Sequence, residues 1–135
     1  MNKQFFISLL FALITFVILG GLFGNFVFLP EFAIWHEAYP DAVRETPDFV
    51  SGFVLGLLQL IAFVVLLPKL QITSGSGAAL FGAVYSVVIW LIVDLQMVSV
   101  TNIVSYEYVL KDALLSAVMG AILGVVVSWS QRRFA

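Results

Sequence analysis

The chain has 135 residues, of which 62% are hydrophobic and 10% are charged, with a net charge of −2 and no cysteine. Soluble domains carry roughly 25% charged residues, so this composition excludes a water-soluble globule. It also excludes disulfides and thiolate metal sites, and the small negative charge argues against binding to nucleic acid. We therefore expect an integral membrane protein with the lipid bilayer as its surroundings.

Four apolar segments are long enough to cross a bilayer, which takes about 20 residues. The first carries no charge over residues 4–30, and no cleavage-site pattern follows it, which disfavours a cleaved signal peptide. The second follows Thr46-Pro47-Asp48, which predicts an N-cap at Thr46. The short loops after the second and third helices predict antiparallel neighbours. We predict a single all-α domain over 1–135, a bundle of four transmembrane helices near 4–28, 48–67, 76–99 and 107–130, with a longer loop at 29–47.

The basic residues predict the orientation of these helices. One side of the membrane would hold Arg44 and Lys111, and the other would hold Lys3, Lys69, Arg132 and Arg133. The positive-inside rule then places both termini in the cytoplasm. The short loops and the N-terminal lysine favour a bacterial inner membrane.

The predicted outer loop, 29–47, is rich in aromatic residues. Pro30 can open a short helix in which Phe32, Trp35 and Tyr39 recur on one face. Such a stripe is typical of a helix that lies at the level of the lipid headgroups, and a binding surface made from the same rings is the alternative. His36 is the only histidine, and its spacing from nearby acids matches no zinc pattern, so we expect no metal site.

Small residues recur at four-residue spacing on all four predicted helices. Such spacing favours close helix packing in a membrane, where hydrophobic burial cannot drive association. We expect these faces to form the core of the bundle, while a second small-residue face on the last helix leaves room for an oligomer or a partner. The predicted packing positions are Gly20, Gly24, Gly52, Gly56, Gly82, Gly120 and Gly124.

Asp94 is the main ionisable residue within the predicted spans. At 1.5 Å per residue it lies about 9 Å from the outer end of its helix, at a level similar to that of Lys111. We expect an Asp94–Lys111 ion pair, or a hydrogen bond that Asp94 accepts from Gln96, Thr101 or Asn102. The functional alternative is a carboxylate that binds a proton or a cation.

Further polar residues fall near Asp94 in the predicted topology. Gln59 lies near the bilayer centre, where interhelical hydrogen bonding is its simplest role. A polar pocket open to the outer face would combine Gln59 and Asp94 with Asn25, Gln96 and Asp112.

Recognisable catalytic motifs are missing from the sequence. There is no HExxH, no glycine-rich phosphate loop and no pair of membrane histidines for haem. We therefore expect no catalytic residues, no cofactor and no enzymatic activity.

Three stretches carry a resemblance to known proteins. They are GGLFGNFVFLPEFAIW at the end of the first helix, Asp94 ahead of Thr101-Asn102, and Asp112 followed by small residues up to Gly124. In this layout the chain resembles small uncharacterised four-helix bacterial membrane proteins, families known only as domains of unknown function. The resemblance implies the four-helix fold and no activity.

Two main function classes follow from these features. The first is a non-enzymatic interaction or accessory subunit that packs against itself or within a larger membrane complex. The second is a small oligomeric transporter or channel that uses Asp94 and Gln59, and lipid or apolar-ligand binding between the helices is a third. A transporter needs Asp94 to face a hydrated cavity, whereas a packing protein can satisfy it with Lys111 or a neighbour.

Overall fold

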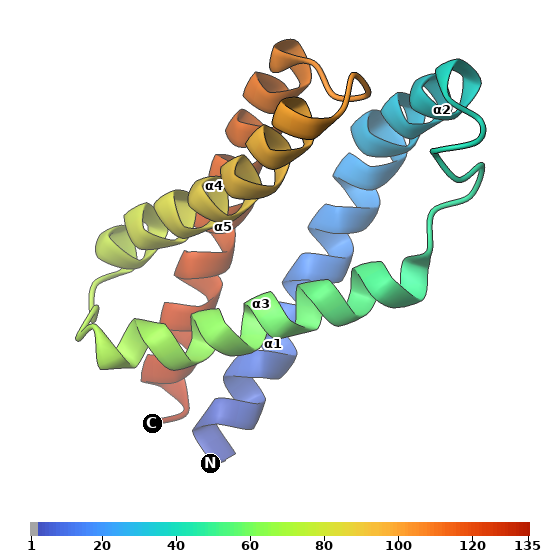
Figure 1. Ribbon diagram of the computed structural model, residues 1–135. Helices are drawn as coiled ribbons and strands as arrows, with labels where there is room; N and C mark the ends of the chain where they lie inside the picture. The colour runs from blue at the N-terminus through green and yellow to red at the C-terminus, as the bar shows by residue number, and fades with distance from the viewer. Residues whose placement is uncertain (1–2) are drawn as a thin grey trace.

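A computed structural model describes residues 3–135, and this part of the chain contains helices and no strand. The continuous helical run over residues 3–38, together with three further helices, gives four helices long and apolar enough to cross a membrane. The protein is therefore an all-α bundle of four transmembrane helices, as predicted (Figure 1). Its elements are α1 (Lys3–Phe23), the π-helical turn η1 (Gly24–Phe28), α2 (Leu29–Ala38), α3 (Phe49–Lys69), α4 (Gly75–Val100) and α5 (Tyr106–Arg133).

The first helix is longer than the sequence predicted. We expected it to end near residue 28, but α1, η1 and α2 run on to Ala38, and the loop spans only residues 39–48. In η1 the backbone N–H of Leu29 bonds to the carbonyl of Gly24, five residues back. Pro30 follows directly, and the wider turn accommodates a residue that has no N–H and whose ring would clash with a tighter helix.

The helix starts are fixed by short polar side chains. Asp48, and not Thr46 as expected, is the N-cap of α3, because its carboxylate accepts bonds from the N–H groups of Val50 and Ser51. Ser105 caps α5 by accepting a bond from the Tyr108 N–H. Ser74 caps α4 in the same manner.

The tightest packing in the bundle joins α4 to α5. A Cβ on Gly82 would stand 2.0 Å from the carbonyl oxygen of Gly120, and one on Gly124 would stand 2.0 Å from the carbonyl oxygen of Ala78. Real Cβ atoms do not approach backbone atoms this closely, so the two backbones lie in contact only because these residues lack side chains.

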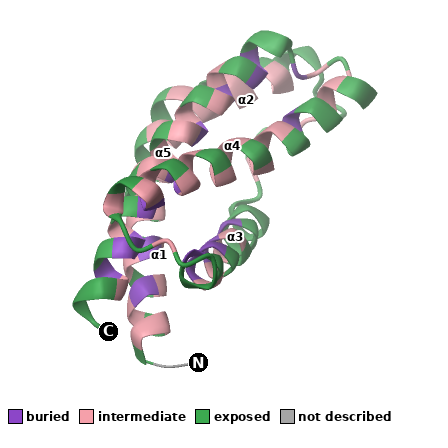
Figure 2. Cartoon of the chain, turned by 90° about the vertical axis from the view of Figure 1, so that its left-hand side faces the viewer, coloured by how far each residue is buried: buried purple, intermediate pink, exposed green. Residues whose placement is uncertain are grey.

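α3 does not lie along α4 as the short loop between them predicted. It crosses the other helices at a steep angle and stands apart from α4 (Figures 1 and 2). The physical reason is a cluster of rings between the two helices, in which Phe63 lies 5.5 Å from Phe81 and 5.3 Å from Tyr85. Three aromatic rings therefore separate α3 from α4, where small residues would have allowed the two helices to pack closely.

The apolar core is concentrated at the end of the molecule where the two termini lie (Figure 1). A second, smaller core at the opposite end contains Val104, Tyr108 and Val109. Large apolar side chains such as Phe26 and Val50 are 77% and 74% exposed, as suits a lipid surrounding rather than water. The main core consists of Ala12, Leu60, Phe63, Val64, Leu67, Ala78 and Val127.

Candidate functional site

Two aspartates meet inside the bundle. Asp94 of α4 and Asp112 of α5 are only 6% and 4% exposed, and their carboxyl groups lie close enough to interact with each other. Ser116, one turn along α5, donates to Oδ1 of Asp112 at 3.3 Å. Oδ2 of Asp94 is buried and accepts no bond from an N–H or O–H donor of residues 3–135. Two adjacent buried carboxylates repel each other, so the arrangement can hold a proton or another cation between them.

The spacing of the close-packed seam explains why these two carboxyl groups meet. Both aspartates continue the small-residue faces on which α4 and α5 pack. The four-residue series is Gly82, Ser86, Trp90 and Asp94 on α4, and Gly124, Gly120, Ser116 and Asp112 on α5. Extending the glycine series of both helices toward their joining loop was therefore the signal that would have predicted the pair.

Lys111 does not pair with Asp94, contrary to our expectation. Its Nζ forms an ion pair with the carboxylate of Glu31 on α2. Consecutive helix residues point in different directions, so Asp112 can face into the bundle while Lys111 faces α2. Among residues 3–135, the two aspartates therefore have no basic partner.

The alternative partners expected for Asp94 do not contact it either. The hydroxyl of Thr101 donates to the carbonyl of Met97 at 2.8 Å, one turn back on its own helix. The side chains of Gln96 and Asn102 are exposed.

The predicted polar pocket forms only in part. Gln59 lines an internal cavity, and its backbone carbonyl accepts a bond from the Tyr85 hydroxyl at 3.1 Å. Asn25 is exposed and donates to the carbonyl of Gly21 at 2.7 Å. Asp94 and Asp112 therefore come together, and Gln59 lies at a neighbouring cavity. Asn25 and Gln96 take no part in the predicted pocket.

The aromatic segment of α2 packs on α5 and on the loop that precedes α5. The ring of Trp35 lies 4.7 Å from that of Tyr108 and 5.1 Å from that of Phe32. The hydroxyl of Tyr39 donates to the carbonyl of Asn102 at 3.1 Å. These contacts, with the Glu31–Lys111 pair, join the end of the first helical run to the start of α5. His36 lies 2.7 Å from the carbonyl oxygen of Val43 through its Nδ1, which ties the loop back onto α2.

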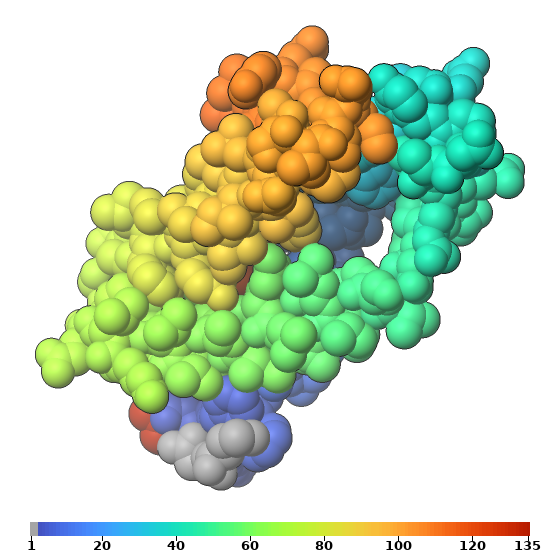
Figure 3. All heavy atoms as spheres, in the orientation of Figure 1, coloured from blue at the N-terminus to red at the C-terminus, as the bar shows by residue number. Residues whose placement is uncertain are grey.

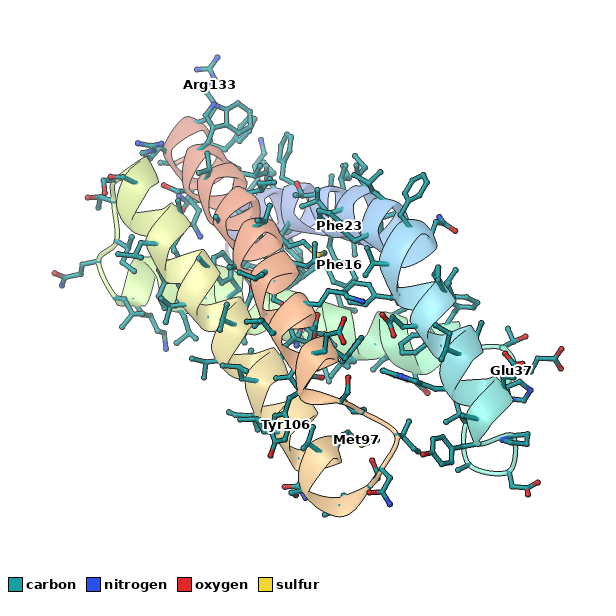
Figure 4. The ribbon with its side chains drawn as sticks, turned by 90° about the horizontal axis from the view of Figure 1, so that it is seen from above. Phe16, Phe23, Glu37, Met97, Tyr106 and Arg133 are labelled. Carbon is teal, nitrogen blue, oxygen red and sulfur yellow. The ribbon has the colours of Figure 1, made fainter. Side chains whose placement is uncertain are left out.

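A pocket of about 230 Å³ opens beside the carboxyl pair. Asp112 and Ser116 provide polar groups in its wall, and Gly20 and Met119 complete it. The aromatic rings in its wall come from α1, η1, α2, α4 and α5, and they are Phe16, Phe28, Phe32, Trp90 and Tyr108. A narrower cavity of about 50 Å³ adjoins it at Ser116 and leads to Gln59. Figure 4 looks down on these helices and shows Phe16 among them, with Glu37 and Arg133 at the margins.

A wider cleft of about 540 Å³ lies between η1, the end of α1 and the first half of α3. Figure 3 shows this opening between α1, α3 and the segment 39–48. Phe16 lies where α1 and α3 approach most closely, because a Cβ on Gly56 would stand 2.5 Å from its ring. Beyond that point the helices diverge, and a Cβ on Gly20, Gly24 or Gly52 would meet no atom of residues 3–135 within 4 Å. The expectation that all the predicted packing glycines form the core is therefore wrong for these three.

Known proteins give no guide to this site. Comparisons of the chain with protein-family models, with curated proteins and with solved structures found no match.

Proposed function

We propose that the protein is a small membrane transport protein that binds a cation at the Asp94–Asp112 pair. The observation that carries this proposal is the burial of two carboxyl groups side by side. Within residues 3–135, the one ion pair of a basic side chain is that of Lys111 with Glu31, so neither aspartate is neutralised from within the described chain.

The cost of burial supports this assignment. One charged side chain at the centre of a membrane helix costs about 2.5–3.5 kcal/mol, and two adjacent negative charges also repel each other. A proton or a cation bound between the carboxyl groups removes most of that cost. Acids inside membrane spans accordingly tend to mark ion pathways.

The cavities around the pair suggest one state of a transport cycle. The pocket at Asp112 adjoins the cleft between α1 and α3, since the two share Phe16, Gly20, Phe28 and Phe32 in their walls. Toward the termini the main core closes the bundle. Movement of a cation to the other side would require that core to open, as alternating access does in larger transporters.

A flux measurement tests this function directly. We expect proteoliposomes that contain the full chain to take up protons or Na⁺ down an imposed gradient, and Asp112→Asn or Asp94→Asn to reduce the rate at least tenfold. Glu107→Gln is the matched control, because Glu107 is an exposed acid on the same helix. Flux of both cations no faster than in empty liposomes, or full flux in both aspartate variants, would overturn the proposal.

We also propose that both termini lie in the cytoplasm of a bacterial inner membrane, which would place the carboxyl pair in the outer half of the bilayer. The absence of native cysteine makes this testable with single-cysteine variants. A thiol reagent that does not cross membranes should label Asp41→Cys in intact cells and should spare Gln71→Cys until the cells are opened. The reverse labelling pattern would reject this orientation.

A role as a non-enzymatic accessory subunit or homo-oligomer is the second candidate. It is favoured by the cleft glycines, Gly24 and Gly52, because small faces of this kind pack helices in membranes, and a Cβ on either glycine would meet no atom of residues 3–135 within 4 Å. Native mass spectrometry in mild detergent should then give a dimer or a larger complex, and Gly24→Leu should dissociate it. A monomer, or an assembly that Gly24→Leu leaves intact, would count against this role for the cleft.

A further inference from the structure

We propose that the pocket at Asp112 binds an organic ammonium ion, which reaches it from the bilayer through the cleft between α1 and α3. This inference rests on the proposed cation-binding function and specifies the class of cation. It is carried by three features of the same region: the walls of the pocket, its size and its connection to the cleft.

The walls of the pocket combine a negative group with aromatic faces. Asp112 supplies a carboxyl group, and Asp94 lies behind it with an oxygen that no donor of residues 3–135 satisfies. Five aromatic side chains, one each from α1, η1, α2, α4 and α5, contribute most of the remaining wall. Aromatic rings attract cations over their faces, and cages of such rings are a known means of holding alkylated ammonium groups.

The same walls disfavour a hard metal ion. Ca²⁺ takes six to eight oxygen ligands and Mg²⁺ about six, many of them charged or carbonyl oxygens. The pocket offers the carboxyl group of Asp112 and the hydroxyl of Ser116 in a mainly aromatic lining. An ammonium ion that carries hydrocarbon groups matches this mixture, because its charge can meet the carboxyl group while its carbons meet the rings.

The size of the pocket sets the size of the ligand. A volume of about 230 Å³ is several times the ~30 Å³ share of one water molecule. It is slightly smaller than the roughly 300–1,000 Å³ typical of sites for drug-sized molecules. The pocket therefore suits an ammonium ion with one ring or a few short chains.

The cleft provides a route from the membrane. Its lining is largely apolar, and its one charged residue is Asp48 at the start of α3. Gly20 belongs to both the cleft and the pocket, and a Cβ there would meet nothing within 4 Å. A bulky side chain at this position can therefore block the passage without a clash in the empty protein.

Binding of a charged probe and its neutral isostere tests the inference. Phenyltrimethylammonium and tert-butylbenzene have the same shape and differ in charge. We expect titration calorimetry on the full chain in lipid nanodiscs to show binding of the ammonium ion and at least tenfold weaker binding of the hydrocarbon. Asp112→Asn should weaken ammonium binding at least tenfold and Trp90→Leu several-fold, while Trp129→Leu, at an exposed ring of α5, should leave it unchanged.

Access through the cleft has its own matched pair of variants. Gly20→Leu should abolish or slow binding, whereas Ala33→Leu, at an exposed position of α2, should not. Circular dichroism and size-exclusion profiles establish that each variant is folded. Unchanged binding in Gly20→Leu would overturn the route through the cleft.

The outcomes separate this inference from the function on which it rests. Equal binding of the two probes, or full ammonium binding in Asp112→Asn, would overturn the ammonium site. Proton or Na⁺ flux that depends on Asp112, without any ammonium binding, would overturn the inference and keep the proposed function. Failure of both flux and binding would reject both.

Discussion

Two pairs of helices in this protein carry glycines at the same spacing and use them differently. Between α4 and α5 the glycines bring the backbones into contact, with Gly82 and Gly120 at the seam. Between α1 and α3 only Gly56 meets a neighbour, the ring of Phe16, while Gly24 and Gly52 face a cleft. Four-residue spacing therefore permits close packing without imposing it, because one large ring at the crossing point is enough to hold two helices apart.

The contrast has a consequence for the polar groups. The closed seam carries Asp94 and Asp112 into the interior, because the close approach of α4 and α5 continues along the faces on which both residues lie. The first helical run leaves a pocket beside Asp112, and this pocket adjoins the cleft of the open pair. A tight hairpin thus buries the acids, and looser packing of the first helical run leaves space next to them.

The largest expected effect comes from adding one methyl group to the seam. Gly120→Ala would place a Cβ 2.1 Å from the carbonyl oxygen of Gly82. Overpacking of this kind typically costs about 1–3 kcal/mol, and backbone atoms have little freedom to move away. Gly52→Ala should instead stabilise the protein by about 0.5–1 kcal/mol, because alanine favours a helix and the new methyl group meets nothing. Thermal unfolding in detergent measures both, and equal effects at the two positions would remove the contrast between seam and cleft.

Much of this fold could be predicted from the sequence, because the span of a bilayer sets the length of an apolar helix and, apart from Asp94 and Asp112, charge lies near the helix ends and in the loops. Ser105 and Ser74 could also be assigned as caps from local sequence. The continuation of the first helix past Pro30 could not be predicted, because it depends on a π-helical turn that no local sequence pattern indicates. The crossing of α3 was equally hidden, because it follows from how Phe63 meets rings of another helix.

The site divides in the same way. Asp94 stood out as an acid within an apolar segment, but its partner depended on which face of α5 turns inward. The depth of Asp94 in the membrane suggested Lys111 as its partner. The face of α5 that packs on α4 instead selects Asp112, because of the two residues only Asp112 continues the glycine series. Where two helices pack through small residues, the helix face on which a polar side chain lies therefore predicts its partner better than its depth in the membrane does.

The carboxyl pair should show the next largest effect on stability. Asp94→Asn and Asp112→Asn each keep the size of the side chain and remove one acid, and the two groups are close enough to interact. Residues that share such a contact usually couple by about 0.5–3 kcal/mol in a double-mutant cycle. We expect a coupling of this size from denaturation of the single and double variants. Strict additivity would mean that the two carboxyl groups do not interact.

A smaller effect is expected where the open side is joined to the closed side. Lys111 and Glu31 link α5 to α2, with 41% and 20% of their side chains exposed. Partly exposed ion pairs contribute about 0–1 kcal/mol, so Glu31→Gln should cost no more than that. Because Trp35 also packs on Tyr108 at this junction, Trp35→Ala should loosen it further. Hydrogen exchange in α2 should rise in both variants and more in Trp35→Ala, and a larger rise in Glu31→Gln would show that the ion pair holds the junction.

The smallest effect should appear at the start of α3, on the open side. The Ser51 hydroxyl and the backbone N–H groups of Ser51 and Val50 donate to Asp48 and lower its pKa from the usual 3.8. A lowered pKa in the folded protein means that this cap stabilises the helix start above pH 3.8 and is lost as the pH falls through the lower folded value. The backbone N–H groups of Val50 and Ser51 should therefore exchange faster once the carboxylate is protonated. Asp48→Asn keeps an acceptor oxygen without a titrating group, so exchange in that variant should follow only the intrinsic effect of pH. If wild type and Asp48→Asn followed the same profile, capping by the carboxylate would have no part in holding the first turn of α3 beside the cleft.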